Sequence, residues 1–188
     1  SVRIRSISAR MAVVAASTVS FLVMVKAMKV PGQRHPVPAM LPIDNPRLWS
    51  PGDPFLYDLE LRVATADGEV FDTVESYAGL RKVHIEGHRV FLNNEPLYQR
   101  LVLDQGFYPD GIWTAPGDDA LRRDIELAMR AGFNGARLHQ KVFEERFHYW
   151  ADRLGYLTWA ESASWGCDCN SELSARNFLS EWQEIVVR

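Results

Sequence analysis

The sequence has little of the features that mark several classes of protein. Only two of its 188 residues are cysteine, Cys167 and Cys169, and their C-D-C spacing matches neither a CxxC redox motif nor half of a convincing zinc site. We therefore expect two free thiols in a loop, with metal binding as the weaker alternative. The net charge of −3 is small, which argues against a dedicated nucleic-acid-binding protein.

Nucleotide-binding motifs and membrane-spanning runs are missing as well. No G-x-G-x-x-G follows a predicted strand and no G-x-x-x-x-G-K-S/T occurs, so nucleotide-binding α/β folds lose support. A mostly apolar run at 11–25 follows three arginines, which is the plan of a signal peptide or a membrane anchor. Its 15 residues are fewer than the ~20 needed to span a bilayer, and hydroxyl residues interrupt it. We therefore favour two or three buried β-strands here over a membrane segment.

Strand and turn signals dominate the first half of the sequence. Residues 56–64 and 70–77 flank an Asp67-Gly68 turn, which predicts an antiparallel hairpin and suggests a β-sandwich. A second hairpin is predicted from 83–85 and 89–92. An irregular connector is expected where prolines cluster, at Pro31, Pro36, Pro38 and Pro42.

Strands and helices alternate beyond residue 97. The predicted order is β-α-β-α-β-α, with strands at 97–103, 133–138 and 156–160. The side chain of Asp118 is expected to cap the first helix, and Gly155 to end the second. The last helix is predicted over 171–187, with candidate buried positions at Leu173, Phe178, Trp182 and Ile185. Each βα repeat has the size of a barrel unit, and this part of the sequence has room for about three of the eight units of a barrel.

Ionisable residues follow the predicted parallel strands. Asp104 comes after the first strand, Arg137 and His139 end the second, and Glu161 directly follows the third. Because ligands bind at the carboxyl ends of parallel strands, we expect these side chains to face one pocket.

Aromatic residues lie in the loops on the same side of the predicted sheet. Tyr108, Trp113 and Trp165 are the candidates for stacking on the C–H face of a sugar. Each of them, taken alone, is more often a packing residue than a sugar platform.

Four motifs, in order, resemble glycoside hydrolase family 2, the group of β-galactosidases, β-glucuronidases and β-mannosidases. They are LWSPGDPFLYDLEL, YAGLRKV, VFLNNEPLYQR and GFNGARLHQKVFEERFHYWADRLGYLTWAE, and the resemblance extends over 45–188. It implies an α+β multidomain fold. A partial immunoglobulin-like β-sandwich over 1–83 would be followed, over 84–188, by an incomplete (β/α)8 TIM barrel of about three βα units.

The resemblance also implies a retaining, exo-acting glycosidase that acts on terminal β-linked sugars. One Glu of such an enzyme protonates the leaving oxygen and a second attacks the anomeric carbon. The acid/base Glu of the family follows Asn at the end of the fourth barrel strand, whereas the Asn94-Glu95 pair precedes the first. Both catalytic Glu are therefore expected beyond Arg188, and we predict no hydrolysis by this chain alone. The alternative function is a non-catalytic carbohydrate-binding or interaction module.

The resemblance assigns the wall of a substrate pocket. Arg137 matches the family's Arg that supports the catalytic carboxylates, and Glu161 matches an acid that in some members helps to hold magnesium or substrate. We assign Asp104, Arg137, His139, Glu161 and Trp165 to the pocket, with a carbohydrate as partner. No cofactor is expected, apart from a possible divalent cation in the intact enzyme. The competing interpretation is structural: ion pairs and hydrogen bonds within the protein for the four polar residues, and packing for Trp165.

Overall fold

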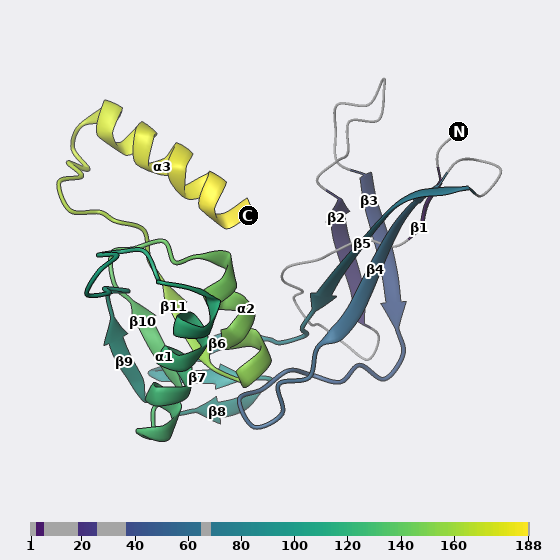
Figure 1. Cartoon of the computed structure of the whole chain (residues 1–188), viewed down its shortest axis with the longest axis horizontal. Coiled ribbons are helices and arrows are strands. Elements are labelled where there is room, and N and C mark those ends of the chain that lie inside the picture. Colours follow the sequence, from purple (N-terminus) through teal and green to yellow (C-terminus); the bar gives the residue numbers. More distant parts are fainter. Residues whose placement is uncertain (1–2, 6–18, 26–36, 65–68, 188) are drawn as a thin grey trace. The chain divides into compact units, whose positions relative to one another are not determined.

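The chain forms two compact units, Ser1–Tyr98 and Gln99–Arg188 (Figure 1). The structure, a computed structural model, describes residues 3–5, 19–25, 37–64 and 69–187.

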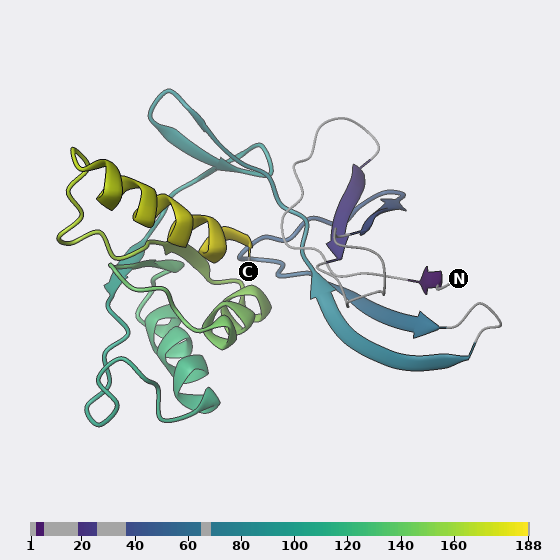
Figure 2. The ribbon, with the colours of Figure 1, turned by 90° about the horizontal axis from the view of Figure 1, so that it is seen from above.

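Antiparallel strands build the first unit. Strands β1 (Arg3–Arg5), β4 (Tyr57–Ala64) and β5 (Val70–Ala78) form a sheet in the order β1-β4-β5. Figure 2 shows β4 and β5 as a long, curved pair. Strand β2 (Val19–Val25) pairs with β3 (Val37–Ile43) in a second, two-stranded sheet. The hairpin of 56–64 and 70–77 is confirmed within a residue at each end, whereas its Asp67-Gly68 turn lies outside the described residues.

The described part of the apolar run, Val19–Val25, is a strand, which agrees with the β-strand character of the favoured interpretation; its predicted burial stays a prediction. Residues 11–18 of that run lie outside the described part of the chain. Within the residues that are described, no helix combines the length and the apolar character needed to cross a membrane.

The prolines around residue 40 do not interrupt the sheet. The prediction of an irregular connector is wrong for Pro38 and Pro42, which lie inside β3, while Pro31 and Pro36 lie outside the described residues. Among the described strands, β3 pairs only with β2, so its other side is an edge of the described sheet. Proline is tolerated on such an edge because its missing N–H then removes no bond from the ladder.

A small meander closes the first unit. It consists of β6 (Val83–Glu86), β7 (Arg89–Leu92) and β8 (Glu95–Leu97), all antiparallel. The β6–β7 hairpin is confirmed, but β8 was not anticipated, because its apolar residue Leu97 was assigned to the following strand. Asn93 and Asn94 make the turn between β7 and β8 with φ of 54° and 69°, in the left-handed region that asparagine tolerates better than most residues.

Trp49 is the buried centre of the first unit among the residues whose side chains are described. Trp49 and Leu80 are both 0% exposed, and the Trp49 backbone N–H donates to the Leu80 carbonyl at 2.7 Å. Asn93 donates from Nδ2 to the Trp49 carbonyl at 2.9 Å and accepts at Oδ1 from the Lys82 N–H at 3.1 Å. One asparagine thus joins the loop before β4 to the meander.

The second unit alternates strands and helices as predicted. Strands β9 (Leu101–Asp104), β10 (Gly135–Leu138) and β11 (Leu157–Ala160) form a parallel sheet with β10 in the centre. The helices are α1 (Asp118–Arg130), α2 (Glu145–Leu154) and α3 (Glu172–Val187). Side chains of the sheet, α1, α2 and the adjoining loops share one apolar core of Tyr108, Leu121, Ile125, Ala136, Leu138, Phe143, Phe147, Ala151 and Tyr156.

The helix ends correct one prediction and confirm another. Gly155 ends α2 with φ of 78°, as its sequence position predicted. Asp118 begins α1 but does not cap it, because its carboxylate accepts from Arg146 Nε at 2.7 Å and from Trp150 Nε1 at 3.0 Å. The bond from Arg146 is the main reason why the pKa of Asp118 falls below its ordinary value. The Asp118 carboxylate therefore links α1 to α2 instead of capping α1.

Helix α3 has the predicted extent but less burial than predicted. Phe178 and Ile185 are half-buried, whereas Leu173 is 59% and Trp182 36% exposed, so the prediction of burial is wrong for these last two. Helical periodicity identified the apolar face correctly, but it cannot say whether a neighbouring element covers that face.

Candidate functional site

The face of the parallel sheet turned away from the core carries the polar strand-end residues. In register, Leu103, Arg137 and Trp159 occupy one row across β9, β10 and β11, and all three are exposed. Side chains alternate along a strand, so His139 and Glu161, two positions further, follow Arg137 and Trp159 on this face. The loops after all three strands leave from this same end of the sheet (Figure 1).

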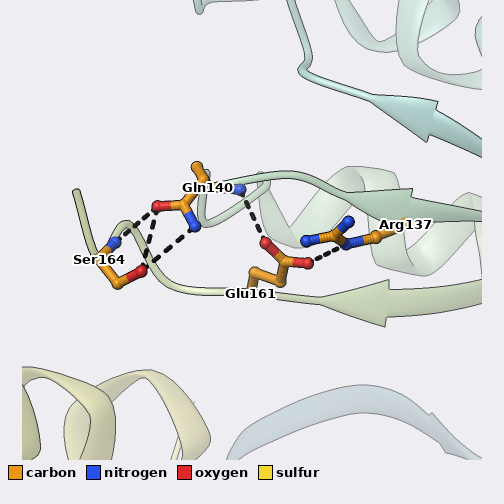
Figure 3. Close-up of polar contacts among 4 residues, drawn as sticks. All are labelled: Arg137, Gln140, Glu161 and Ser164. Atoms are coloured by element: carbon orange, nitrogen blue, oxygen red, sulfur yellow. Dashed lines mark hydrogen bonds and ion pairs between the residues drawn. The ribbon is translucent and has the colours of Figure 1, made fainter.

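Arg137 and Glu161 form an ion pair at the ends of neighbouring strands (Figure 3). Arg137 Nε donates to Glu161 Oε1, and the second oxygen, Oε2, accepts from the backbone N–H of Gln140 at 3.3 Å. The Arg137 guanidinium is the main cause that lowers the pKa of Glu161, and the Gln140 N–H adds to it. Glu161 is therefore a carboxylate at neutral pH. The Arg137 side chain is 49% exposed, which leaves the guanidinium accessible to a ligand.

Gln140 ties this pair to the loop after β11. Its Oε1 accepts from the Ser164 N–H at 2.7 Å, and its Nε2 donates to Ser164 Oγ at 3.3 Å (Figure 3). The Gln140 backbone has φ of 55°, a left-handed conformation that turns the chain sharply after β10. Gln140 and Ser164 were missed in the sequence, because a polar pair 24 positions apart gives no periodic signal.

Asp104 does not join this cluster. It lies beside the fully buried Leu138 in register, and it lines a groove of the helix-facing side together with Asp124 of α1 and Tyr156. Its Oδ1 accepts from the Gly106 N–H at 2.8 Å. Burial raises the pKa of Asp104, and the bond from Gly106 opposes part of that rise.

Asp104→Asn is expected to stabilise the chain at neutral pH, because it removes a charge that burial disfavours while keeping an acceptor for the Gly106 N–H. A carboxyl whose pKa is raised in the folded state contributes most stability below its unfolded pKa, and loses it as pH rises through the folded pKa. Urea midpoints should therefore differ more between Asp104→Asn and the parent chain at pH 7 than at pH 4. Asp104→Ala, which also loses the acceptor, should cost about 1 kcal/mol relative to Asp104→Asn. A parent chain that gains stability between pH 4 and 7 relative to Asp104→Asn would contradict this assignment.

The other two candidate residues, His139 and Trp165, lie in the loops after β10 and β11. The His139 backbone N–H donates to the Asp104 carbonyl at 2.8 Å, and the residue is half-buried. Trp165 lies in the loop after β11 and is 82% exposed.

The same loop holds Cys167 and Cys169 as free thiols. Among the described residues no group of three or more His, Cys, Asp or Glu side chains is placed to hold a metal ion.

Known proteins similar to this chain are glycosidases. The sequence model described as glycosyl hydrolases family 2 matches residues 2–81, so the similarity begins well before residue 45, where the motifs began. A β-galactosidase of Lactococcus lactis is 29% identical over 131 residues, which cover 70% of this chain and 13% of that enzyme. A β-galactosidase of Leuconostoc mesenteroides is 33% identical over 61% of this chain and 11% of that enzyme. The chain thus spans about an eighth of the length of these curated relatives.

Solved structures give the same answer. The β-glucuronidase of Parabacteroides merdae superposes with a TM-score of 0.61 at 29% identity, over 68% of this chain and 16% of that one. A family 2 glycosyl hydrolase of Bacteroides cellulosilyticus superposes equally well at 28% identity, over 68% of this chain and 16% of its own. The family model, the curated relatives and the solved structures agree, and together they support similarity of this chain to part of glycosyl hydrolases family 2.

Proposed function

We propose that this chain supplies one wall of the substrate pocket of a β-glycosidase that releases a terminal sugar with retention of configuration. The observation that carries the proposal is the Arg137–Glu161 pair at the carboxyl ends of two parallel strands, in a chain that is similar to this family. A guanidinium held there by a carboxylate presents fixed N–H donors, which suit the oxygens of a sugar or of a further carboxylate.

The domain assignment belongs to the same proposal. Residues 1–83 would form part of an immunoglobulin-like sandwich, and residues 84–188 would begin a TIM barrel. The parallel order β9-β10-β11 with intervening helices supports a barrel in the second part, and the antiparallel pairs β4–β5 and β2–β3 support a sandwich in the first. The antiparallel meander β6–β8, which this division assigns to the barrel part, belongs to the first compact unit. In a barrel, catalytic residues come from the ends of several strands, so three strands carry only part of a site.

Glu161 is assigned a positioning role, not that of nucleophile or acid. One of its oxygens accepts from Arg137 and the other from the Gln140 N–H, so both face the protein. A general acid would need a raised pKa, whereas the pKa of Glu161 is lowered. The proposal therefore places the two reacting carboxylates of the retaining mechanism outside residues 1–188.

A panel of nitrophenyl β-glycosides tests the proposal. The panel would include the galactoside and the glucuronide, since relatives of both names exist. We expect no hydrolysis by the 188-residue chain and hydrolysis by the product of the same gene extended past Arg188.

In the active form, Arg137→Leu should lower kcat/KM about 100-fold, as removal of a fixed donor near a developing charge does, while Arg123→Leu on α1 should leave it unchanged. Hydrolysis by the short chain would overturn the role given to Glu161, and inactivity of both forms on every glycoside would overturn the function.

A further inference from the structure

The loop after β11 carries both cysteines of the chain as neighbouring thiols. Cys167 is half-buried and Cys169 is exposed, and neither is in a disulfide. The hydrogen bond between the two side chains is the main cause that raises the pKa of the Cys169 thiol above its ordinary value, and the Asp168 carboxylate adds to the rise. The two sulfurs are therefore close in space as well as in sequence.

A reversible disulfide is the chemistry that fits this pair. In the part of the chain that the structure describes, the cysteines belong to no group of three or more side chains placed to hold a metal ion. Residues two positions apart have Cα atoms at most about 7 Å apart, which overlaps the ~4.4–6.8 Å range of disulfides. The short ring that such a bond closes is strained, and strained or exposed disulfides are the labile ones.

Hydrogen bonds to α3 hold this loop in its reduced form. Ser174 Oγ donates to Cys167 Sγ at 3.5 Å and accepts from the Asp168 N–H at 3.1 Å. The Ser171 N–H donates to the Asp168 carbonyl at 3.0 Å, which encloses Cys169 in a turn at the start of the helix. Joining the two sulfurs requires both side chains to reorient. Disulfide formation therefore competes with the contacts between the loop and α3.

The same loop reaches the Arg137–Glu161 pair. The Cys167 N–H donates to the Ser164 carbonyl at 3.0 Å, and the Ser164 N–H donates to Gln140 Oε1 at 2.7 Å (Figure 3). The backbone N–H of Gln140 in turn donates to Glu161 Oε2 at 3.3 Å. Hydrogen bonds thus lead step by step from the two thiols to the carboxylate at the end of β11.

We propose that Cys167 and Cys169 are a reversible redox site, which a small-molecule disulfide such as oxidised glutathione converts to an intramolecular disulfide, and that this conversion loosens the bridge between Ser164 and Gln140. One cysteine thiolate attacks oxidised glutathione, forms a mixed disulfide and releases one glutathione. The other cysteine then attacks the protein sulfur of the mixed disulfide and releases the second glutathione. The protein loses two protons and two electrons, and the oxidised glutathione gains them.

Mass spectrometry of the 188-residue chain treated with oxidised glutathione tests the site. We expect the parent chain to lose two hydrogens and to keep no glutathione, and dithiothreitol to restore both thiols. Cys167→Ser and Cys169→Ser, which each lack the second thiol, should instead retain one glutathione. A glutathione that stays on the parent chain, a failure to react, or a disulfide between two chains would overturn the site.

Ser174→Ala tests the role of α3. This change removes the hydrogen bond to Cys167 Sγ and the acceptor of the Asp168 N–H, so it should favour the disulfide. In a fixed mixture of reduced and oxidised glutathione, the ratio of oxidised to reduced chain should rise about fivefold, the factor that corresponds to one ordinary hydrogen bond. Ser180→Ala, at an exposed position of the same helix, is the matched control and should leave the ratio unchanged. Equal ratios in the two variants would show that the contacts of Ser174 do not hold the reduced form.

Hydrogen exchange tests the link to the ion pair. Oxidation should speed exchange of the Ser164 amide toward the rate found in Gln140→Ala, where that amide has lost its acceptor. In Cys169→Ser, which cannot close the disulfide, the rate should stay at that of the reduced parent. Slow Ser164 exchange in a chain that has formed the disulfide would overturn the link. Neither readout requires hydrolysis, so inactivity toward every glycoside would overturn the proposed function and leave the redox site standing.

Discussion

Gly135→Ala is expected to destabilise the second unit by about 3 kcal/mol or more. Gly135 begins the central strand β10, and a methyl group placed there would lie 2.4 Å from the Leu157 carbonyl oxygen and 2.7 Å from Leu101 Cδ2. The first of these atoms is backbone of the neighbouring strand β11, so no side-chain rotation can relieve the contact. The strands must separate, and this breaks the parallel ladder on which the core of α1 and α2 rests.

Urea denaturation followed by hydrogen exchange in β10 measures this effect. Gly117→Ala is the matched control, because Gly117 has extended backbone with φ of 174° and an added methyl would meet nothing within 4 Å. Its free energy of unfolding should change by less than about 1 kcal/mol. If both variants melted with the parent chain, the close approach of β10 and β11 at Gly135 would be refuted.

Much of the second unit could be predicted from the sequence because its signals are local. Phe147 and Ala151 recur on one helical face and are 1% and 2% exposed. Gly155 stops the helix where only a residue tolerant of positive φ fits comfortably. The alternation of strands and helices in the sequence also predicts that Arg137 and Glu161 lie near the carboxyl ends of neighbouring parallel strands. The structure brings those two side chains together.

The parts that could not be predicted depend on contacts between distant segments. Strand position alone placed Asp104 at the right end of the sheet, but not on the right face, because its neighbour in register, Leu138, belongs to the helix-facing layer. Asp118 has the chemistry of a helix cap, yet Arg146 and Trp150 of the next helix take its carboxylate. The left-handed backbone of Gln140 has no sequence signature, since glutamine is not a usual residue for positive φ.

Residue composition was a misleading guide to the first unit. The prolines at 38 and 42 suggested a connector because proline lacks a backbone N–H donor. On the outer side of an edge strand, however, a backbone N–H has no partner strand to bond, so its absence costs no ladder hydrogen bond. The family model then extended the similarity back to residue 2, over a stretch whose own motifs are weak. A β-strand requires a pattern of apolar and polar positions more than particular residues. A family profile can therefore match a stretch of strands in which no single motif stands out.

Trp49→Ala is expected to cost the first unit about 3–5 kcal/mol, the usual loss when a fully buried Trp is truncated. Trp49 is 0% exposed and packs with Leu80, which is also 0% exposed, while the Arg81 guanidinium lies 4.6 Å above its ring. The methyl left by alanine cannot fill this space, and the guanidinium loses its aromatic partner. Since isolated domains have only about 5–15 kcal/mol of total stability, this one change removes a large part of it.

Trp165→Ala provides the comparison, because Trp165 is 82% exposed and its loss should alter stability by less than about 0.5 kcal/mol. Trp49→Phe separates volume from aromatic character: it keeps a ring beneath Arg81 and should recover part of the loss. Hydrogen exchange of the β6–β7 amides reports on the first unit, since Asn93 links the Trp49 carbonyl to this hairpin. Equal protection in Trp49→Ala and Trp165→Ala would mean that the meander is stable without the buried indole, and that the hydrogen bonds of Asn93, rather than burial of Trp49, hold the first unit together.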